Sequence, residues 1–178
     1  MSQLSKKICL IGDFAVGKTS LIRRFVYSVF DDKYLSTIGV KVSRKTIVLS
    51  RQYSSVQEQV TEMTMMLWDL AGSEEFTQVR ASYLRGAAGA ILVCDLTRPE
   101  TLVNLRGYAD DLFKASPKAK IVLAANKQDL ADQVRIEQAA IENVAVSLSA
   151  PYYLTSAKTD TNVEMLFHHL GQLLITPA

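Results

Sequence analysis

The sequence contains little cysteine, glycine or proline for its 178 residues. Two Cys, eight Gly and four Pro exclude a disulfide-rich mini-protein, a collagen-like chain and a low-complexity chain. Cys9 and Cys94 each stand in a short apolar run, where a thiol behaves as a small hydrophobic side chain, so we expect no disulfide. Because 48% of the residues are hydrophobic, the chain can bury the core of one domain without a structural metal.

An excess of charge of one sign and long hydrophobic runs are also absent. Twenty basic and eighteen acidic residues give a net charge of +2, too small to indicate binding to nucleic acid or membranes through bulk electrostatics. No run approaches the roughly 18 apolar residues of a membrane span, and the start MSQLSKK lacks a signal-peptide core. The second residue is not Gly, and the end GQLLITPA has no Cys for lipidation. We therefore expect a cytoplasmic protein with no nucleic-acid partner and no membrane anchor in this sequence.

Apolar runs typical of strands alternate with helical patterns along the chain. Five of the six expected strands are predicted at 6–12, 41–49, 61–68, 88–94 and 120–125, and helices at 18–26, 75–84, 100–115, 134–146 and 161–175. The segments 41–49 and 61–68, joined by the polar stretch 50–60, favour an antiparallel hairpin. The order predicts a single α/β domain over residues 1–178. We expect a six-stranded, mostly parallel sheet with one antiparallel edge strand, and five helices on its two faces.

The strongest motif follows the first predicted strand and opens the first predicted helix. Its sequence, Gly12-Asp-Phe-Ala-Val-Gly17-Lys18-Thr19, matches the phosphate-binding P-loop. The glycines let backbone N–H groups surround phosphate oxygens, Lys18 can reach the β and γ phosphates, and the Thr19 hydroxyl would face Mg²⁺. The predicted phosphate-binding residues are Gly12, Asp13, Phe14, Ala15, Val16, Gly17, Lys18, Thr19 and Ser20. A chance match in a turn is the alternative, and this motif alone leaves adenine and guanine both open.

A second motif, Asn126-Lys127-Gln128-Asp129, directly follows the apolar strand that ends at Ala125. Ligands bind at this edge of doubly wound sheets. Asp129 can accept hydrogen bonds from the N1–H and the exocyclic amine of guanine together, a donor pair that adenine lacks. By itself the motif is a common polar turn, but after a P-loop it predicts guanine binding.

Five short segments span nearly the whole chain: GDFAVGKT at 12–19, Thr37-Ile38-Gly39 after Tyr34, WDLAGSEEF from Trp68, NKQD at 126–129 and TSAK at 155–158. In their order and spacing they resemble the motifs of a small GTPase of the Ras superfamily. Their local sequences are most similar to those of the Rab branch. The resemblance implies one GTP-binding domain that takes GTP and GDP with Mg²⁺.

The resemblance also implies a role for individual residues. Phe30 would line the guanine ring, and Ser156, Ala157 and Lys158 would brace the base. Phe30 could instead be a core residue, and the TSAK turn only a helix cap. The implied metal residues are Thr19 and Thr37, with Asp69 holding a metal-bound water. The implied catalytic residues are Lys18, Thr37, Gly72 and Ser73, with Thr37 and the Gly72 N–H on the γ-phosphate.

A switch mechanism follows from this arrangement. Thr37 and Gly72 lie on two loops that are tethered only while the γ-phosphate and Mg²⁺ are present. We expect a monomer whose effector, exchange-factor and activating proteins contact residues 30–40 and 68–82. Trp68, between the two loops, could contact such a partner or only pack in the domain.

Two residues depart from the family pattern. Ser73 stands where most members carry the Gln that orients the attacking water. Phe14 occupies a P-loop position where a small residue leaves space for an arginine from an activating protein. Both changes predict slow hydrolysis and a poor response to an activating protein. The alternative is that Phe14 points into solvent and another group positions the water.

Other functions remain open at this stage. The chain could be a non-hydrolysing GTP-binding scaffold, or the GTPase domain of a larger protein. An adenine-nucleotide kinase or ATPase is disfavoured by Asp129 and by the absence of a second substrate motif. The stretch 50–60 is read as a long solvated hairpin loop, with a dedicated partner surface as the alternative.

Overall fold

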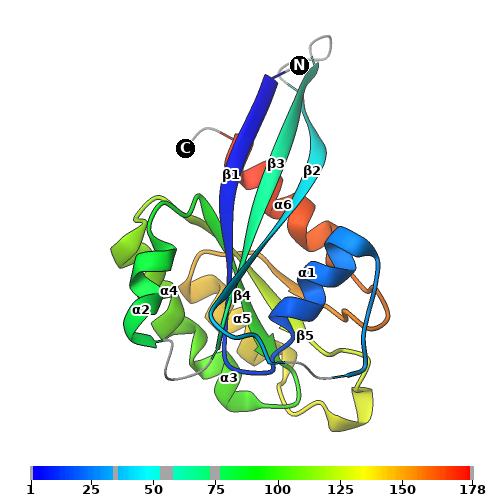
Figure 1. Ribbon diagram of the computed structural model, residues 1–178. Helices are drawn as coiled ribbons and strands as arrows, with labels where there is room; N and C mark the ends of the chain where they lie inside the picture. Colours follow the sequence, from blue (N-terminus) through cyan, green and yellow to red (C-terminus); the bar gives the residue numbers. More distant parts are fainter. Residues whose placement is uncertain (1, 34–35, 53–57, 73–76, 177–178) are drawn as a thin grey trace.

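Strands and helices alternate along the chain as the hydrophobic pattern predicts (Figure 1). The computed structural model describes residues 2–33, 36–52, 58–72 and 77–176. Its strands are β1 Ser2–Ile11, β2 Val40–Gln52, β3 Glu58–Leu70, β4 Gly89–Asp95, β5 Lys120–Asn126 and β6 Tyr152–Leu154. Its helices are α1 Lys18–Tyr27, α2 Thr77–Leu84, α3 Pro99–Val103, α4 Leu105–Ala115, α5 Gln138–Ser147 and α6 Val163–Ile175, with a 3₁₀ turn at Ala131–Gln133.

Within the described residues the strands form one sheet in the order β2-β3-β1-β4-β5-β6. β2 pairs with β3 in the antiparallel direction, and the other neighbouring pairs are parallel. The crossovers that join parallel strands carry the helices to both faces of the sheet. The predicted α/β fold, with one antiparallel edge strand, is confirmed.

Alternate side chains of the central strands face two separate cores. In β4, Ile91 and Val93 belong to the core beneath α1 and α6, whereas Leu92 and Cys94 belong to the core beneath α2, α3, α4 and α5. Figure 1 shows these two groups of helices on opposite sides of the sheet. Because both faces are covered, every residue of β4 is buried. Because β1, β4 and β5 are parallel neighbours, their carboxyl ends share one edge of the sheet, where the sequence motifs lie.

The hairpin of β2 and β3 differs from the prediction. The two strands continue through most of the stretch read as a loop, and their ladder ends where Gln52 pairs with Glu58. Residues 53–57, the remainder of that loop, lie outside the described residues. The end of α6 supports the extension, since Gln172 Nε2 donates to the main-chain oxygen of Ser50 at 3.2 Å. Residues 50–52 and 58–60 contain no Gly or Pro that would oppose strand pairing, and their polar composition alone was misleading.

Two helix boundaries also differ from the prediction. The helix predicted over 100–115 is interrupted at Asn104, which separates α3 from α4. The helix predicted from residue 134 begins only at Gln138. Among the described residues, no helix combines the length and apolar character needed to cross a membrane.

Candidate functional site

A pocket of about 310 Å³ opens at the carboxyl edge of the sheet, where the loops after β1, β3, β5 and β6 meet. Ligands of open α/β sheets bind at this edge. Fourteen predicted site residues line the pocket: Phe14, Ala15, Gly17, Lys18, Thr19, Ser20, Phe30, Thr37, Gly72, Asn126, Lys127, Asp129, Ala157 and Lys158. Segments that are distant in sequence therefore meet around one cavity.

Other predicted site residues lie behind the lining. Five of them do not line the pocket but form hydrogen bonds, described below, with residues that do: Gly12, Asp13, Val16, Asp69 and Ser156. Ser73 lies outside the described residues, as does Tyr34. The prediction also missed several lining residues, namely Arg23, Val29, Asp31, Asp32, Lys33, Leu70 and Leu130. Most of these flank Phe30 or a motif in sequence, and that nearness is the signal that could have found them.

Lys18 is held beneath the P-loop. Its ammonium group donates to the main-chain oxygens of Gly12 at 2.8 Å and Asp13 at 2.7 Å, and the residue is 6% exposed. Burial lowers the pKa of Lys18 to about 8, although the negative charges of Asp69 and Asp13 oppose this shift. An ammonium group has three donors, so the two carbonyls leave one for an anion in the pocket.

Asn126 joins the two sequence motifs. Its Nδ2 donates to the main-chain oxygen of Val16 at 2.9 Å, and its Oδ1 accepts from the Thr155 hydroxyl at 3.1 Å. A Cβ atom at Gly17, whose φ is 105°, would lie 2.2 Å from Nδ2 of Asn126. The close approach of the P-loop to Asn126 therefore requires glycine at position 17.

Asp129 and the TSAK turn form the far end of the pocket. The Ser156 hydroxyl donates to Oδ1 of Asp129 at 2.6 Å, which fixes the direction of that carboxylate. Arg24 donates from Nε to the main-chain oxygen of Ala157 at 2.8 Å and from Nη2 to that of Lys158 at 2.9 Å. A carboxylate has about four lone-pair positions, so Asp129 retains acceptors for a ligand.

Three oxygen-bearing side chains converge beside the P-loop. The Thr19 hydroxyl donates to Oδ2 of Asp69 at 2.5 Å and lies 2.7 Å from the Thr37 hydroxyl, which is 3.4 Å from the same carboxylate oxygen. Asp69 is 2% exposed, and its Oδ1 has no hydrogen-bond partner among the described residues. Burial raises the pKa of Asp69, while the Thr19 hydrogen bond and the Lys18 charge oppose this. Hydroxyl and carboxylate oxygens are ligands that Mg²⁺ prefers, and the unpartnered buried oxygen fits a cation-bound water.

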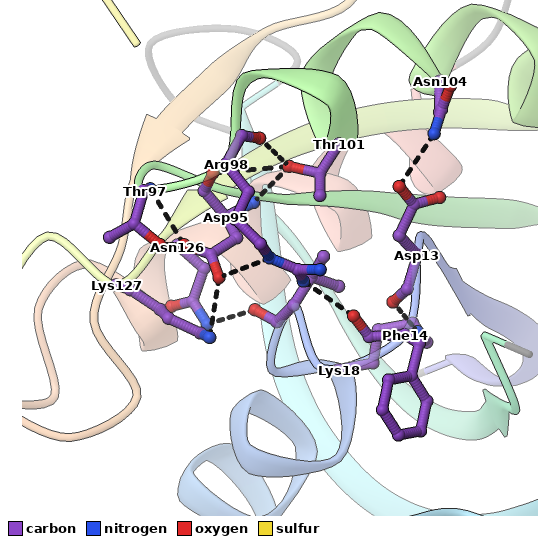
Figure 2. Close-up of polar contacts among 11 residues, drawn as sticks. Asp13, Phe14, Lys18, Asp95, Thr97, Arg98, Thr101, Asn104, Asn126 and Lys127 are labelled. Atoms are coloured by element: carbon purple, nitrogen blue, oxygen red, sulfur yellow. Dashed lines mark hydrogen bonds and ion pairs between the residues drawn. The ribbon is translucent and has the colours of Figure 1, made fainter. Parts of the chain in front are cut away.

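Asp95, at the end of β4, is a buried centre of charge that sequence reasoning missed (Figure 2). Its Oδ2 lies 2.7 Å from Nζ of Lys127 and 3.2 Å from Nε of Arg98. Its Oδ1 accepts hydrogen bonds from the N–H and the hydroxyl of Thr97 at 2.9 and 2.7 Å. Burial alone would raise the pKa of Asp95, but the bonds from Lys127 and Thr97 outweigh it and leave the pKa below its usual value. Its position at a strand end beside the P-loop strand was the available signal.

Phe14 and Gly72 stand where two loops touch. A Cβ atom at Gly72 would lie 2.6 Å from the main-chain N of Phe14, so the loop after β3 lies directly against the P-loop. Phe14 is 46% exposed and lines the pocket, and Figure 2 shows its ring pointing away from Asp95 and Arg98. A ring that borders the pocket is consistent with the crowding predicted for an incoming arginine, and its exposure is consistent with the solvent-facing alternative.

Trp68 and Phe30 each have packing contacts. The Trp68 ring lies 6.4 Å from that of Tyr83 between centroids, and Nζ of Lys7 lies 4.0 Å from its centroid. These contacts favour the packing alternative for Trp68. Phe30 packs against the core beneath α1 and α6 and also lines the pocket. Its contact with a guanine ring stays a prediction.

Comparison with known proteins agrees with this geometry. The Ras family model, described as "Ras family", matches residues 7–176. A "GTP-binding protein ypt1" from the fission yeast Schizosaccharomyces pombe is 35% identical over 162 residues, which cover 90% of this chain and 75% of that protein. The chain therefore belongs to the Ras family and is a Rab-like small GTPase.

Proposed function

We propose that this chain binds GTP and GDP with Mg²⁺ and acts as a nucleotide-dependent switch that hydrolyses GTP slowly. The observation that carries the proposal is that Lys18 and Asp129 line one pocket. One is the cation expected of a phosphate site, and the other is a carboxylate able to accept both Watson–Crick N–H donors of guanine. The pocket volume of about 310 Å³ is typical of a small-molecule site. Family membership and the name of the yeast relative support GTP as the ligand.

The phosphate and base ends of the site have separate roles. The ammonium of Lys18 would offset phosphate charge, while the P-loop N–H groups would donate to phosphate oxygens. At the other end, Asp129 would select guanine, held in direction by Ser156. Lys127 and Phe30 line the same pocket and would contact the faces of the base or ribose.

Mg²⁺ would be held by the Thr19 and Thr37 hydroxyls, with Asp69 bonding to a water on the ion. The buried Asp69 carboxylate and its two hydroxyl neighbours support this assignment. When bound, Mg²⁺ would offset the negative charge of the terminal phosphates. The bond between Thr19 and Thr37 joins α1 to the loop before β2, so this pair connects the metal site to the segment that would respond to the γ-phosphate.

The switch would operate through the loops that carry Thr37 and Gly72. Exposed hydrophobic side chains on or beside these loops support partner binding there, since Ile38 is 93% exposed and Val79, in α2, is 48% exposed. We propose that effector, exchange-factor and activating proteins contact residues 30–40 and 68–82 of a monomer. These partners would distinguish the ordered GTP form from the relaxed GDP form.

Slow hydrolysis is proposed because of Ser73 and Phe14. A Ser hydroxyl is shorter than the Gln amide that orients water in this family. A non-hydrolysing GTP-binding scaffold is the second candidate, favoured by the same two residues. Single-turnover hydrolysis of bound GTP distinguishes the two, since a scaffold would release no phosphate.

The direct test is the identity of the nucleotide that copurifies with the protein. We expect GDP or GTP, recovered by denaturing the protein and separating the nucleotides by chromatography. Recovery of ADP or ATP, or stronger binding of ATP than of GTP in competition, would contradict the proposal.

A further inference from the structure

The loop after β4 carries an arginine that bonds to both the P-loop and a buried acid. Nη2 of Arg98 donates to the main-chain oxygen of Phe14 at 2.7 Å, although the two residues are 84 positions apart. Nε of the same guanidinium donates to Oδ2 of Asp95 at 3.2 Å. Figure 2 shows Arg98 between Asp95 and the Phe14 backbone. One planar group thus connects a buried carboxylate to a P-loop carbonyl.

The Phe14 carbonyl belongs to the peptide unit that also contains the N–H of Ala15. In a trans peptide the C=O and the N–H point in opposite directions. A bond that holds the carbonyl on the Arg98 side therefore holds the Ala15 N–H on the opposite side. Ala15 lines the pocket and has a φ of 61°, a left-handed conformation that is unfavourable for a residue with a Cβ. This turn of the backbone therefore gains from an external restraint.

The same peptide lies near the position expected for the outer phosphates. Lys18, which serves the β and γ phosphates in P-loops, bonds to the carbonyls of Gly12 and Asp13 just before it. The Asp13 carboxylate is held separately, by Nδ2 of Asn104 at 2.8 Å and the Tyr108 hydroxyl at 2.7 Å. The segment before Phe14 thus has its own anchors, and Arg98 acts on the next peptide.

We propose that Arg98 is a positioning residue for the nucleotide, which aims the Ala15 N–H at the phosphates beyond the α-phosphate. A charged donor on the carbonyl also polarises the peptide and makes its N–H a stronger donor. Asp95 holds the guanidinium in place, and Lys127 bonds to the same carboxylate oxygen at 2.7 Å. The restraint on the P-loop is therefore connected to the base motif. This inference rests on the proposed nucleotide binding.

The test compares the dissociation rate of GDP with the affinity for GMP, which lacks the β-phosphate. Arg98→Met removes the guanidinium and keeps an unbranched side chain. Arg106→Met is the matched control, because Arg106 is an exposed arginine on α4 and its loss changes the net charge equally. Arg98→Lys keeps the charge but lacks the fork that reaches two acceptors at once.

We expect Arg98→Met to release GDP about tenfold faster than the parent, as for loss of a charge-assisted hydrogen bond. Its affinity for GMP should change by less than about twofold, since GMP lacks the phosphates that the Ala15 N–H serves. Arg106→Met should match the parent in both measurements. Arg98→Lys should release GDP at an intermediate rate, because one ammonium nitrogen does not reproduce the two separate positions, Nε and Nη2, from which Arg98 bonds Asp95 and the Phe14 carbonyl.

Unchanged GDP release in Arg98→Met, or an equal loss of GDP and GMP binding, would overturn the inference while leaving the proposed function intact. If Arg98→Met does not fold, Arg98→Lys decides, because its ammonium still neutralises Asp95. GDP release at the parental rate in that variant would likewise reject the role of Arg98. Failure of the parent to bind any guanine nucleotide would instead reject the proposed function itself.

Discussion

We expect single side chains at the two ends of the pocket to have separable tasks, with base choice depending on Asp129. Its carboxylate lines the pocket and accepts a 2.6 Å hydrogen bond from Ser156. Asp129→Asn replaces one acceptor by an amide donor, which would oppose the N–H groups of guanine. We expect GTP affinity to fall by at least about 1–2 kcal/mol and xanthosine triphosphate to bind better than it does to the parent. Equilibrium titration with both nucleotides measures this.

Asp132→Asn is the matched control for this experiment, because Asp132 is exposed in the neighbouring 3₁₀ turn. It makes the same chemical change three residues away and should leave GTP binding unchanged. GTP binding by Asp129→Asn as tight as that of the parent would show that Asp129 does not read the base.

At the phosphate end, substitutions of Lys18 and Thr19 should differ in their effects on the affinities for GTP and GDP. Lys18→Ala should weaken both nucleotides, because the ammonium is the buried cation of the P-loop. Thr19→Asn should harm the GTP complex more than the GDP complex, because it removes the hydroxyl shared with Thr37 and Asp69. Titrations with Mg²⁺ present measure both effects. An equal loss of GTP and GDP affinity in Thr19→Asn would contradict its role as a metal ligand.

Among the structural elements, the P-loop and the loop after β3 touch at Gly72, and we expect this contact to affect the rate of hydrolysis. Gly72 lies against Asp13 and Phe14 with no space for a Cβ atom, and Ser73 is the next residue in the sequence. We expect intrinsic hydrolysis no faster than the order of 10⁻⁴ s⁻¹, the rate that applies to Ras itself. Ser73→Gln should raise this rate, and the double change with Phe14→Gly should exceed either single change, because neighbouring groups couple.

Single-turnover hydrolysis by the parent, the two single variants and the double variant tests this expectation. The Phe14→Gly protein alone shows how much of the effect comes from space in the P-loop. If the parent already hydrolyses GTP tens of times faster and Ser73→Gln changes nothing, some other group positions the water.

For the molecule as a whole, the pocket lies between segments that the two cores position separately. α1 belongs to one core, while α3 and α4 belong to the other.

A ligand that binds only the native state stabilises it by mass action, by about 2.7 kcal/mol at a hundredfold excess over its Kd. For a chain of this length we expect GDP with Mg²⁺ to raise Tm by about 5–10 °C, and chelation of Mg²⁺ with EDTA to reverse part of the rise. Thermal melts with GDP, ADP and EDTA measure this, and an equal shift with ADP would contradict guanine selectivity.

Much of the fold and of the pocket lining was predictable from the sequence, because those signals are local. The continuous apolar runs of β4 and β5 predicted buried parallel strands, and both are almost fully buried. The P-loop and the segment 126–129 each follow a strand, so their place at the carboxyl edge followed from topology. The ends of β2 and β3 were not predictable, because backbone pairing carried the ladder through polar residues whose composition resembles a loop.

The sequence by itself determined which residues could carry chemistry: a phosphate loop, a base motif and oxygen donors, each identified by the residue types of one short segment. Only the tertiary structure decided how these segments bond to one another. Asn126 reaches Val16 across 110 residues, and Arg98 reaches Phe14 across 84. Such pairs have no local pattern, because they depend on where two cores place the ends of adjacent strands. Asp95 appears in the sequence as one acid among eighteen, and it becomes the anchor of Arg98 and Lys127 only because β4 ends beside both the P-loop and β5.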